Sequence, residues 1–378
     1  MLTSLHSKFA RGTIKQEIDS NLNQANVALR AGNFDLASEY AHLVLSAKIG
    51  SRNSRLAADL LLIEVRSRQG LFSGVLDQLE LLFKKVSRSS PELQSRVGNE
   101  ILRVCFRSGN LGIGARRGED LLQEFSSSWP EIEVVELLCQ LSSCHFHRGD
   151  TARAEELVMR ALEITDRSKF AKARTQTLWQ SSVLTTNRGD LPLALQQAKE
   201  AKHWAQIAGM QHVIPILNNN AALIMLDLPD ADFSLIHRLA ESAYLDMSSQ
   251  NNPAGSGYAC EILSEAALRQ EDYENALMYA KKGLLELPPE IPGPKASLLV
   301  QIAKVHARLG NMMEAKVQSH VAAEHMEQLE PSRELAKQWG DLARVYVEVG
   351  LADRGIYAYE RAIQMSGLLR EEQDTKVN

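Results

Sequence analysis

The sequence has few cysteines and no long apolar run, and both absences exclude classes of protein. Its four cysteines include no CxxC pair and are too sparse in 378 residues for a disulfide scaffold. They suit a reducing compartment. No stretch of about 18 apolar residues occurs, and the first ten residues lack the apolar core of a signal peptide. We therefore expect a soluble, cytoplasmic protein that does not enter a membrane.

An excess of positive charge is also missing. The formal net charge is -5, which counts against a surface that neutralises many phosphates. We therefore expect no direct binding of nucleic acid by this chain. The GxSxG, HExxH, P-loop and kinase motifs are absent as well, and Gly109, Gly112 and Gly114 have the wrong spacing for a dinucleotide loop. We expect no enzyme activity and no cofactor.

One cluster of thiols and imidazoles resembles a metal site in composition only. Cys139, Cys144, His145 and His147 lie close together in the sequence, but at helical spacing they point in different directions. Ligands of one metal ion have to converge on one point. We expect buried thiols here and no metal.

Glycines that end a helical pattern recur at one spacing along most of the chain. They stand at positions 32, 70, 109, 149, 189, 310 and 350, so the gaps are 38, 39, 40, 40, 121 and 40 residues. The long gap equals three periods, and residues 228–230 and 270–272 supply turn residues near the two missing positions. This regularity predicts nine turns, each joining two amphipathic helices that need neighbours to bury their apolar faces.

The clearest helix pair covers residues 339–363. Its expected buried positions at helical spacing are Leu342, Ala343, Tyr346 and Val349 before the turn at Gly350, and Gly355, Tyr359, Ala362 and Ile363 after it.

A small residue is expected about five positions after most turns, where two helices approach closely. The series is Ala37, Val75, Gly114, Ala154, Ala194, Ser234, Ala276, Ala315 and Gly355. Seven residues further on, only Glu241 in the sixth repeat interrupts a second series of small or apolar residues. A large side chain would overpack such a contact, so Ala276→Arg is expected to destabilise the fold.

This pattern of a turn, an aromatic, a small residue and then Ala-Leu resembles the tetratricopeptide repeat, most clearly in residues 272–288 and 339–363. The period near 40 is similar to the long-period arrays in the sensor regions of bacterial helix-turn-helix transcription regulators. The resemblance implies an all-α, right-handed superhelical solenoid of about nine antiparallel helix pairs over residues 14–366. Residues 1–13 would form an N-terminal arm and residues 367–378 a disordered polar tail.

Charge is distributed unevenly in the third and fourth repeats. Residues 84–117 contain eight basic side chains against two acidic ones, whereas residues 118–136 contain six acidic side chains and no basic one. Adjacent helices could neutralise each other. Alternatively, Arg96, Arg103 and Arg107 form a basic strip for an acidic ligand, in which case Arg103→Glu weakens binding without unfolding the chain.

In tetratricopeptide arrays the first helix of each pair lines the concave surface. The resemblance therefore implies a set of groove residues, found by counting back from each turn: Arg96, Asn99, Arg103, Arg107, Gln140, Ser143, His147, Gln176, Trp179, Asn187, Asn219 and Asn220. Amides, arginines and a tryptophan suit an extended peptide, because they pair with its backbone and charges and stack on its side chains.

We therefore expect a regulatory protein that binds a peptide or protein, an acidic one in particular, with a link to transcription. No helix-turn-helix precedes residue 14, so DNA binding would need a second chain or a missing segment. The alternative is a constitutive adaptor or assembly scaffold without a small ligand. The sequence names neither the partner nor the oligomeric state.

Overall fold

The computed structural model of the chain describes residues 2–47, 50–86, 90–168, 170–288 and 290–366. The described residues form eighteen α-helices: α1 Leu2–Arg30, α2 Phe34–Ser46, α3 Arg52–Arg68, α4 Val75–Lys85, α5 Pro91–Arg107, α6 Leu111–Phe125, α7 Glu131–His147, α8 Thr151–Ser168, α9 Ala171–Asn187, α10 Leu191–Ile207, α11 Ile214–Leu226, α12 Phe233–Ser249, α13 Pro253–Arg269, α14 Tyr273–Glu286, α15 Pro292–Arg308, α16 Met312–Met326, α17 Arg333–Glu348 and α18 Ala352–Met365. A short 3₁₀ helix, η1 Gln211–Val213, precedes α11.

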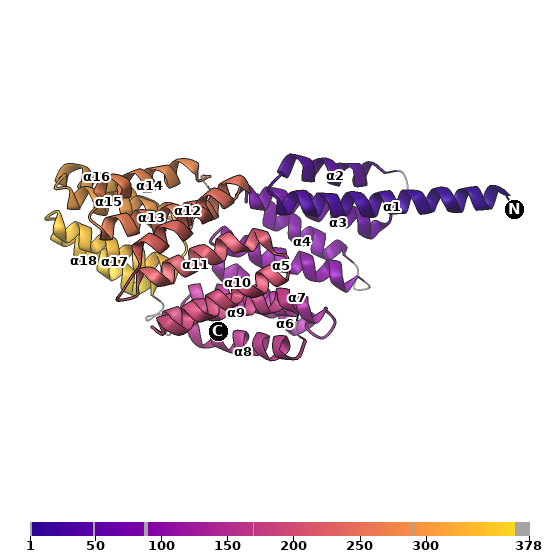
Figure 1. The fold of residues 1–378 in the computed structure, drawn as a ribbon, viewed down its shortest axis with the longest axis horizontal. Helices are drawn as coiled ribbons and strands as arrows, with labels where there is room; N and C mark the ends of the chain where they lie inside the picture. Colours follow the sequence, from indigo (N-terminus) through magenta and orange to yellow (C-terminus); the bar gives the residue numbers. More distant parts are fainter. Residues whose placement is uncertain (1, 48–49, 87–89, 169, 289, 367–378) are drawn as a thin grey trace, which may run out of the picture.

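The helices pair in chain order and wind into a superhelix (Figure 1). Each odd-numbered helix packs on the even-numbered helix that follows it and on the next odd-numbered helix. Figure 1 shows α1–α4 on one side, α12–α18 on the other and α5–α11 between them. The prediction of an all-α, tetratricopeptide-like solenoid of nine helix pairs is confirmed for the described residues. The proposed arm and tail stay predictions: α1 begins at Leu2, and residues 367–378 lie outside the described residues.

Left-handed backbone ends the first helix of most pairs. All seven turn glycines expected from the spacing have a positive φ, for example 77° at Gly70 and 80° at Gly109. Glycine adopts this conformation without the steric cost that a Cβ would add. In the seventh pair Glu271 takes this place with φ 60°. Polar caps then start several second helices, as at Asp272, whose carboxylate accepts a hydrogen bond from the Asn275 backbone N–H.

The predicted small residues are buried in every pair except the sixth. Ser234 and Glu241 are exposed, whereas Ile236 and Ala243 are buried two residues further on. The physical reason is that residues 227–232 join α11 to α12 without a glycine in left-handed backbone, so the repeat period does not locate the start of α12. The prediction of Ser234 as a packing residue is therefore wrong.

The last pair shows how an array ends. Leu342, Ala343, Tyr346 and Val349 are buried, as the spacing predicted, and Trp339 of α17 is fully buried as well. On α18, however, Tyr359 is 43% exposed and Ile363 is 51% exposed. The buried residues of this helix are Gly355, Ala358 and Met365. No further described helix covers the outer side of α18, so the prediction that Tyr359 and Ile363 pack inward is wrong.

Successive turns of the superhelix touch along a line that we call the seam. Asn251 Nδ2 donates to the Gly32 carbonyl at 2.8 Å, and the Glu290 carboxylate accepts from the Phe72 and Ser73 backbone N–H groups at 2.6 and 2.9 Å. Glu330 accepts from the Gly112 backbone N–H at 2.8 Å. These partners lie 217 to 219 residues apart, about five and a half repeats. The seam therefore joins successive turns of the superhelix by hydrogen bonds.

Gly32→Ala is expected to open the seam locally. A Cβ at Gly32 would lie 1.9 Å from the backbone oxygen of Gln250, so one backbone has to move. Gly189→Ala is the matched control, because Gly189 has a similar φ of 84° but nothing within 4 Å of its Cβ position. Both variants carry the left-handed strain of about 1–2 kcal/mol. Only Gly32→Ala should speed hydrogen exchange around residue 251; equal exchange in both variants would contradict the seam contact.

Candidate functional site

The inner faces of α3, α5, α7 and α9, together with the end of α1, bring together a dense set of charged side chains. We call this set the inner charge cluster: Arg30, Glu64, Arg68, Arg96, Glu100, Arg103, Arg107, Glu133, Glu136 and Lys172. Repeats stack side by side, so residues at equivalent positions of successive first helices become neighbours. Six cations stand against four carboxylates.

Arg103 is held within the cluster by two carboxylates. Its guanidinium forms ion pairs with Glu100 from the same helix and Glu136 from α7, and Lys172 pairs with Glu136 at 3.0 Å. Burial opposes the charge of Arg103, but Glu136 and Glu100 together raise its pKa above the usual range. Burial likewise works against ionised Glu136, but Arg103 and Lys172 hold its pKa below the usual range. The charge of Arg103 is thus neutralised by carboxylates of the protein itself.

Arg68 and Arg107 are not neutralised in the same way. Arg107 Nη1 donates to Ser67 Oγ at 3.1 Å and lies 4.0 Å from a Glu100 oxygen. Glu100 also accepts from Ser67 and pairs with Arg103, so it is shared. Burial lowers the pKa of Arg107 to about 10 and also lowers that of Arg68, against the opposing pull of Glu100 and Glu64 respectively. Within the described part of the chain, Arg68 makes no ion pair or hydrogen bond.

His212 reaches the same region from η1, between the fifth and sixth pairs. Its side chain is half-buried. Burial lowers the pKa of His212 to about 4, and the positive charges of Arg68, Arg30 and Lys172 lower it further. The imidazole is therefore neutral at pH 7 and offers one donor and one acceptor beside the arginines.

A row of polar side chains continues the inner face from α7 to α11. Ser143 donates to Gln180 Oε1 at 2.8 Å, and Asn220 donates to Ser182 Oγ at 2.8 Å. The side-chain oxygen of Gln176 has no hydrogen-bond partner. Half-buried Gln140 makes no hydrogen bond within the described residues. The row therefore holds amide groups with hydrogen-bonding capacity to spare.

Two of the residues predicted to line the groove are buried instead between helices. Asn99 is 0% exposed and donates to the Glu133 carbonyl and carboxylate, while Asn219 is 7% exposed and donates to the Gly255 carbonyl. Both amides join one first helix to the next, so they position helices and are not available to a ligand. Arg96 is more open, with its side chain 35% exposed and 3.9 Å from Glu64.

Two other predicted groove residues, His147 and Asn187, connect the inner face to the seam. Asn187 accepts a hydrogen bond from Arg333 at 2.6 Å, and the same guanidinium lies over the Phe146 ring. Burial and the charge of Arg333 lower the pKa of His147 to about 4. Trp179 is half-buried and packs beside Leu178 and Leu217.

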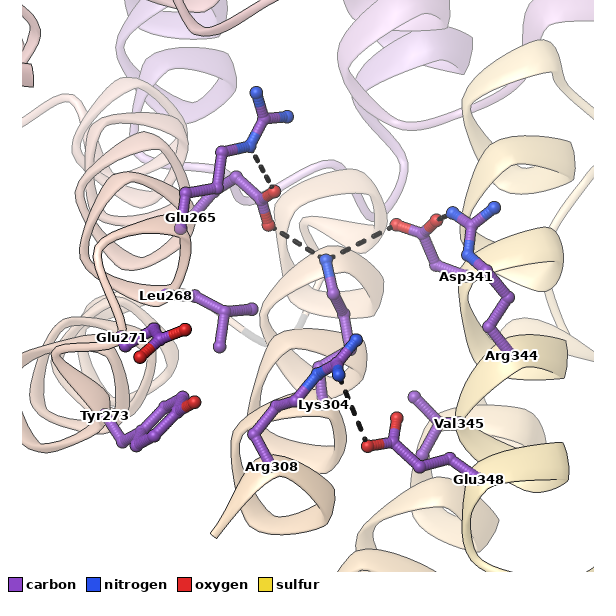
Figure 2. A pocket seen from close by; sticks show the side chains of 11 residues that line it. Glu265, Leu268, Glu271, Tyr273, Lys304, Arg308, Asp341, Arg344, Val345 and Glu348 are labelled. Carbon is purple, nitrogen blue, oxygen red and sulfur yellow. Dashed lines mark hydrogen bonds and ion pairs between the residues drawn. The ribbon is translucent and has the colours of Figure 1, made fainter.

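The inner face of the C-terminal repeats forms a cavity of about 350 Å³ whose charges are largely paired (Figure 2). Lys304 lies between Glu265, at 2.9 Å, and Asp341, at 3.8 Å. Arg269 donates to Glu265, and Arg344 pairs with Asp341. Each of these ions already has a counterion. A charged ligand would therefore gain less from this cavity than from the arginines of the inner charge cluster.

A second group of carboxylates is expected to make the stability of the fold depend on pH. Burial, then repulsion from Glu261, raises the pKa of Glu334 to about 7, opposed by Lys337, and Tyr258 lies nearby. Since the unfolded carboxyl titrates near 4.5, folding favours the protonated form, and stability should fall as pH rises from about 4.5 to about 7.

The expected loss between pH 5 and pH 8 is about 1–3 kcal/mol, and Glu334→Gln should remove much of it. The measurement is the melting temperature at both pH values. Glu163→Gln is the control, because Glu163 is an exposed residue of α8. Equal pH profiles for wild type and Glu334→Gln would contradict this assignment.

The cysteines are buried, as predicted, and burial raises the pKa of each thiol to about 12. Among the described residues no three His, Cys, Asp or Glu side chains gather as metal ligands would. None of the described helices is long and apolar enough to cross a membrane.

Sequence reasoning missed Arg68 and His212. Arg68 stands two residues before Gly70, as Arg107 stands two residues before Gly109, so repeat counting could have found it. His212 lies in an irregular connection and carries no periodic signal.

The architecture has solved counterparts, although no family model and no curated protein matches the sequence. A Rap protein complexed with competence and sporulation factor is similar over 95% of this chain and 99% of its own, with 14% identity and a TM-score of 0.64. Aspartyl phosphate phosphatase F from Bacillus subtilis is similar over 96% of both chains, with 12% identity and a TM-score of 0.51. NprR in complex with its cognate peptide NprX is similar over 75% of this chain and 85% of its own, with 12% identity and a TM-score of 0.50. At these identities the likeness shows the fold alone, a tetratricopeptide-like superhelix.

Proposed function

We propose that this chain is a regulatory protein that binds an extended peptide along the inner face of its superhelix. The observation that carries the proposal is the combination of Arg68 and Arg107, which lack full counterions, with the polar row of α7, α9 and α11. An extended peptide brings backbone donors and acceptors at regular spacing as well as charge. Gln140 and Gln176 can pair with such a backbone, because their amides both donate and accept.

The solved neighbours support the choice of ligand class. NprR was solved with a cognate peptide, and the Rap protein was solved with competence and sporulation factor. Both share this architecture, and we extend the binding of a peptide such as NprX to this chain as part of the proposal. The phosphatase neighbour contributes its fold only, so the proposal contains no catalytic step.

The seam supplies a route from binding to regulation. Arg333 contacts Asn187 and Thr151 across the seam and influences His147 on the inner face. A ligand that contacts His147 or Asn187 competes with Arg333 and thereby changes the balance of seam contacts. A ligand shifts such an equilibrium only through different affinities for the two arrangements. The output implied by the resemblance to transcription regulators is a changed contact with a DNA-binding partner chain.

The test is a thermal-shift screen against pooled random peptides, run beside a pull-down from native extract. A peptide that binds the native state raises the melting temperature by mass action. We expect pools that stabilise wild type but not Gln140→Trp, a variant that fills the groove without changing charge. A folded partner recovered equally by both proteins, with no stabilising pool, would contradict peptide binding and favour the alternative of a constitutive scaffold.

A further inference from the structure

The last described helix pair leaves large apolar side chains in contact with water. Each of four such side chains is between 43% and 59% exposed: Val347 of α17 and Ile356, Tyr359 and Ile363 of α18. The three on α18 recur at spacings of three and four, so they share one side of the helix. We call the four side chains the end face. A further helix pair would pack at this place, and repeat arrays usually present a polar surface there.

The contacts of α18 place the end face on the side away from the rest of the array. Arg361 pairs with Glu327, the residue that follows α16, at 2.7 Å. Ile363 stands two residues further on, about 200° around the helix, so it points away from α16. Val347 adjoins the start of α18, because a Cβ at Gly355 would lie 2.8 Å from its side chain. Figure 1 shows α18 at the outer edge of the molecule.

The two edges of the end face carry opposite charges. On α18, exposed Asp353 and Glu360 stand beside the apolar side chains and form no ion pair within the described part of the chain. On α17, Lys337 and Arg344 are exposed along the other edge. Arg344 also pairs with Asp341, yet its side chain remains 68% exposed. An acidic edge and a basic edge therefore flank one apolar strip.

A surface with this pattern is complementary to itself. A two-fold axis parallel to the helices would set α18 of one copy against α17 of another. The acidic edge of each copy then meets the basic edge of the other, so the favourable contact occurs twice. The apolar side chains meet between these edges and leave water, which favours association.

We infer that the end face joins two copies of this chain into a symmetric dimer. Asp353 and Glu360 of each copy pair with the partner's Lys337 and the partner's Arg344. The end face shares no residue with the inner charge cluster or with the polar row of α7, α9 and α11, so the dimer leaves the proposed peptide groove open. Failure of the dimer would leave the proposed function in place.

The first measurement is the mass of the full chain by sedimentation equilibrium, at protein concentrations from about 1 to 200 µM. Wild type should be dimeric in the upper part of this range. Ile363→Glu puts a charge into the apolar strip of both copies and should raise the dissociation constant by at least about 100-fold. Wild type that stays monomeric throughout would overturn the inference.

Leu285→Glu is the matched control for Ile363→Glu. Leu285 is the most exposed of the large apolar side chains, at 88%, and lies on α14, away from the end face. It should dimerise as wild type does, and all three proteins should show folded melting curves. Equal dissociation constants for wild type, Leu285→Glu and Ile363→Glu would also overturn the inference.

Glu360→Lys and Arg344→Glu test the pairing of the edges. Each variant alone brings like charges together at both contacts and should dimerise at least about 10-fold more weakly than wild type. Mixed in equal amounts, the two should form a heterodimer, because the reversed edge of each is complementary to the other. Glu163→Lys on α8 makes the same change in net charge as Glu360→Lys and should dimerise as wild type does.

Two results would contradict the edge pairing and the dimer built on it. One is a mixture of Glu360→Lys and Arg344→Glu that associates no better than either variant alone. The other is a different protein that copurifies with wild type but not with Ile363→Glu, while purified wild type stays monomeric; the end face would then belong to that protein.

Discussion

Arg103→Gln is expected to destabilise the chain by about 3–5 kcal/mol, because removing one partner of a buried ion pair leaves the other charge uncompensated. Glu100 is 2% exposed and Glu136 is 4% exposed, and both lose their main counterion. Arg103→Glu, which the basic-strip hypothesis treated as a pure binding variant, should be worse because it adds a third carboxylate. The measurement is the unfolding midpoint together with hydrogen exchange in α5 and α7, since repeat arrays unfold in parts.

Two controls separate this mechanism from general damage. Arg96→Gln removes a more exposed arginine, 3.9 Å from Glu64, and should cost at most about 1 kcal/mol. Arg103→Gln with Glu136→Gln should recover part of the loss, because fewer unpaired carboxylates remain. If Arg103→Gln melts like wild type, the assignment of Arg103 to the interior network is wrong.

Ala276→Arg is expected to cost about 4 kcal/mol or more, through overpacking and burial of an unpaired charge. Ala276 is 0% exposed where α13, α14 and α15 meet, beside Ala267 and Val305. Its carbonyl also accepts a hydrogen bond from Ser264, which fixes the distance between the two helices of the pair.

Ser234→Arg is the matched control, since Ser234 holds the same position by sequence counting but is exposed. It should change stability by less than about 0.5 kcal/mol. Thermal and denaturant unfolding of the two variants tests whether the repeat spacing or the structure gives the correct packing position in the sixth pair. Similar destabilisation by both would contradict the shift of two residues in the sixth pair.

The sequence predicts the repeat because its physical causes are local. A glycine in left-handed backbone ends the first helix of seven of the nine pairs, and a small residue such as Ala276 or Ala315 lets the second helix approach. The packing position of the sixth pair was predicted wrongly, because its turn, residues 227–232, is longer than most and has no glycine. A period counted from neighbours then gives the wrong register, and Ile236 and Ala243 carry the packing.

The seam and much of the site could not be predicted from the repeat period. Contacts such as Glu290 with Phe72 depend on the superhelical pitch, which arises from small rotations at every helix interface. Charge spacing on α5 correctly marked a cluster, but it did not decide which arginine is neutralised. That depends on Glu136 and Lys172, supplied by two other repeats.

The proposed function depends on the binding of an extended peptide by the inner face. The most direct measurement is the dissociation constant of the strongest library-selected peptide for wild type, for Gln140→Trp and for Arg160→Trp on the outer face, each first shown to be folded by its melting curve. Gln140→Trp alone is expected to lose at least about 10-fold in affinity, or about 1.4 kcal/mol. Equal affinity for all three proteins, or no peptide that binds wild type, would contradict it.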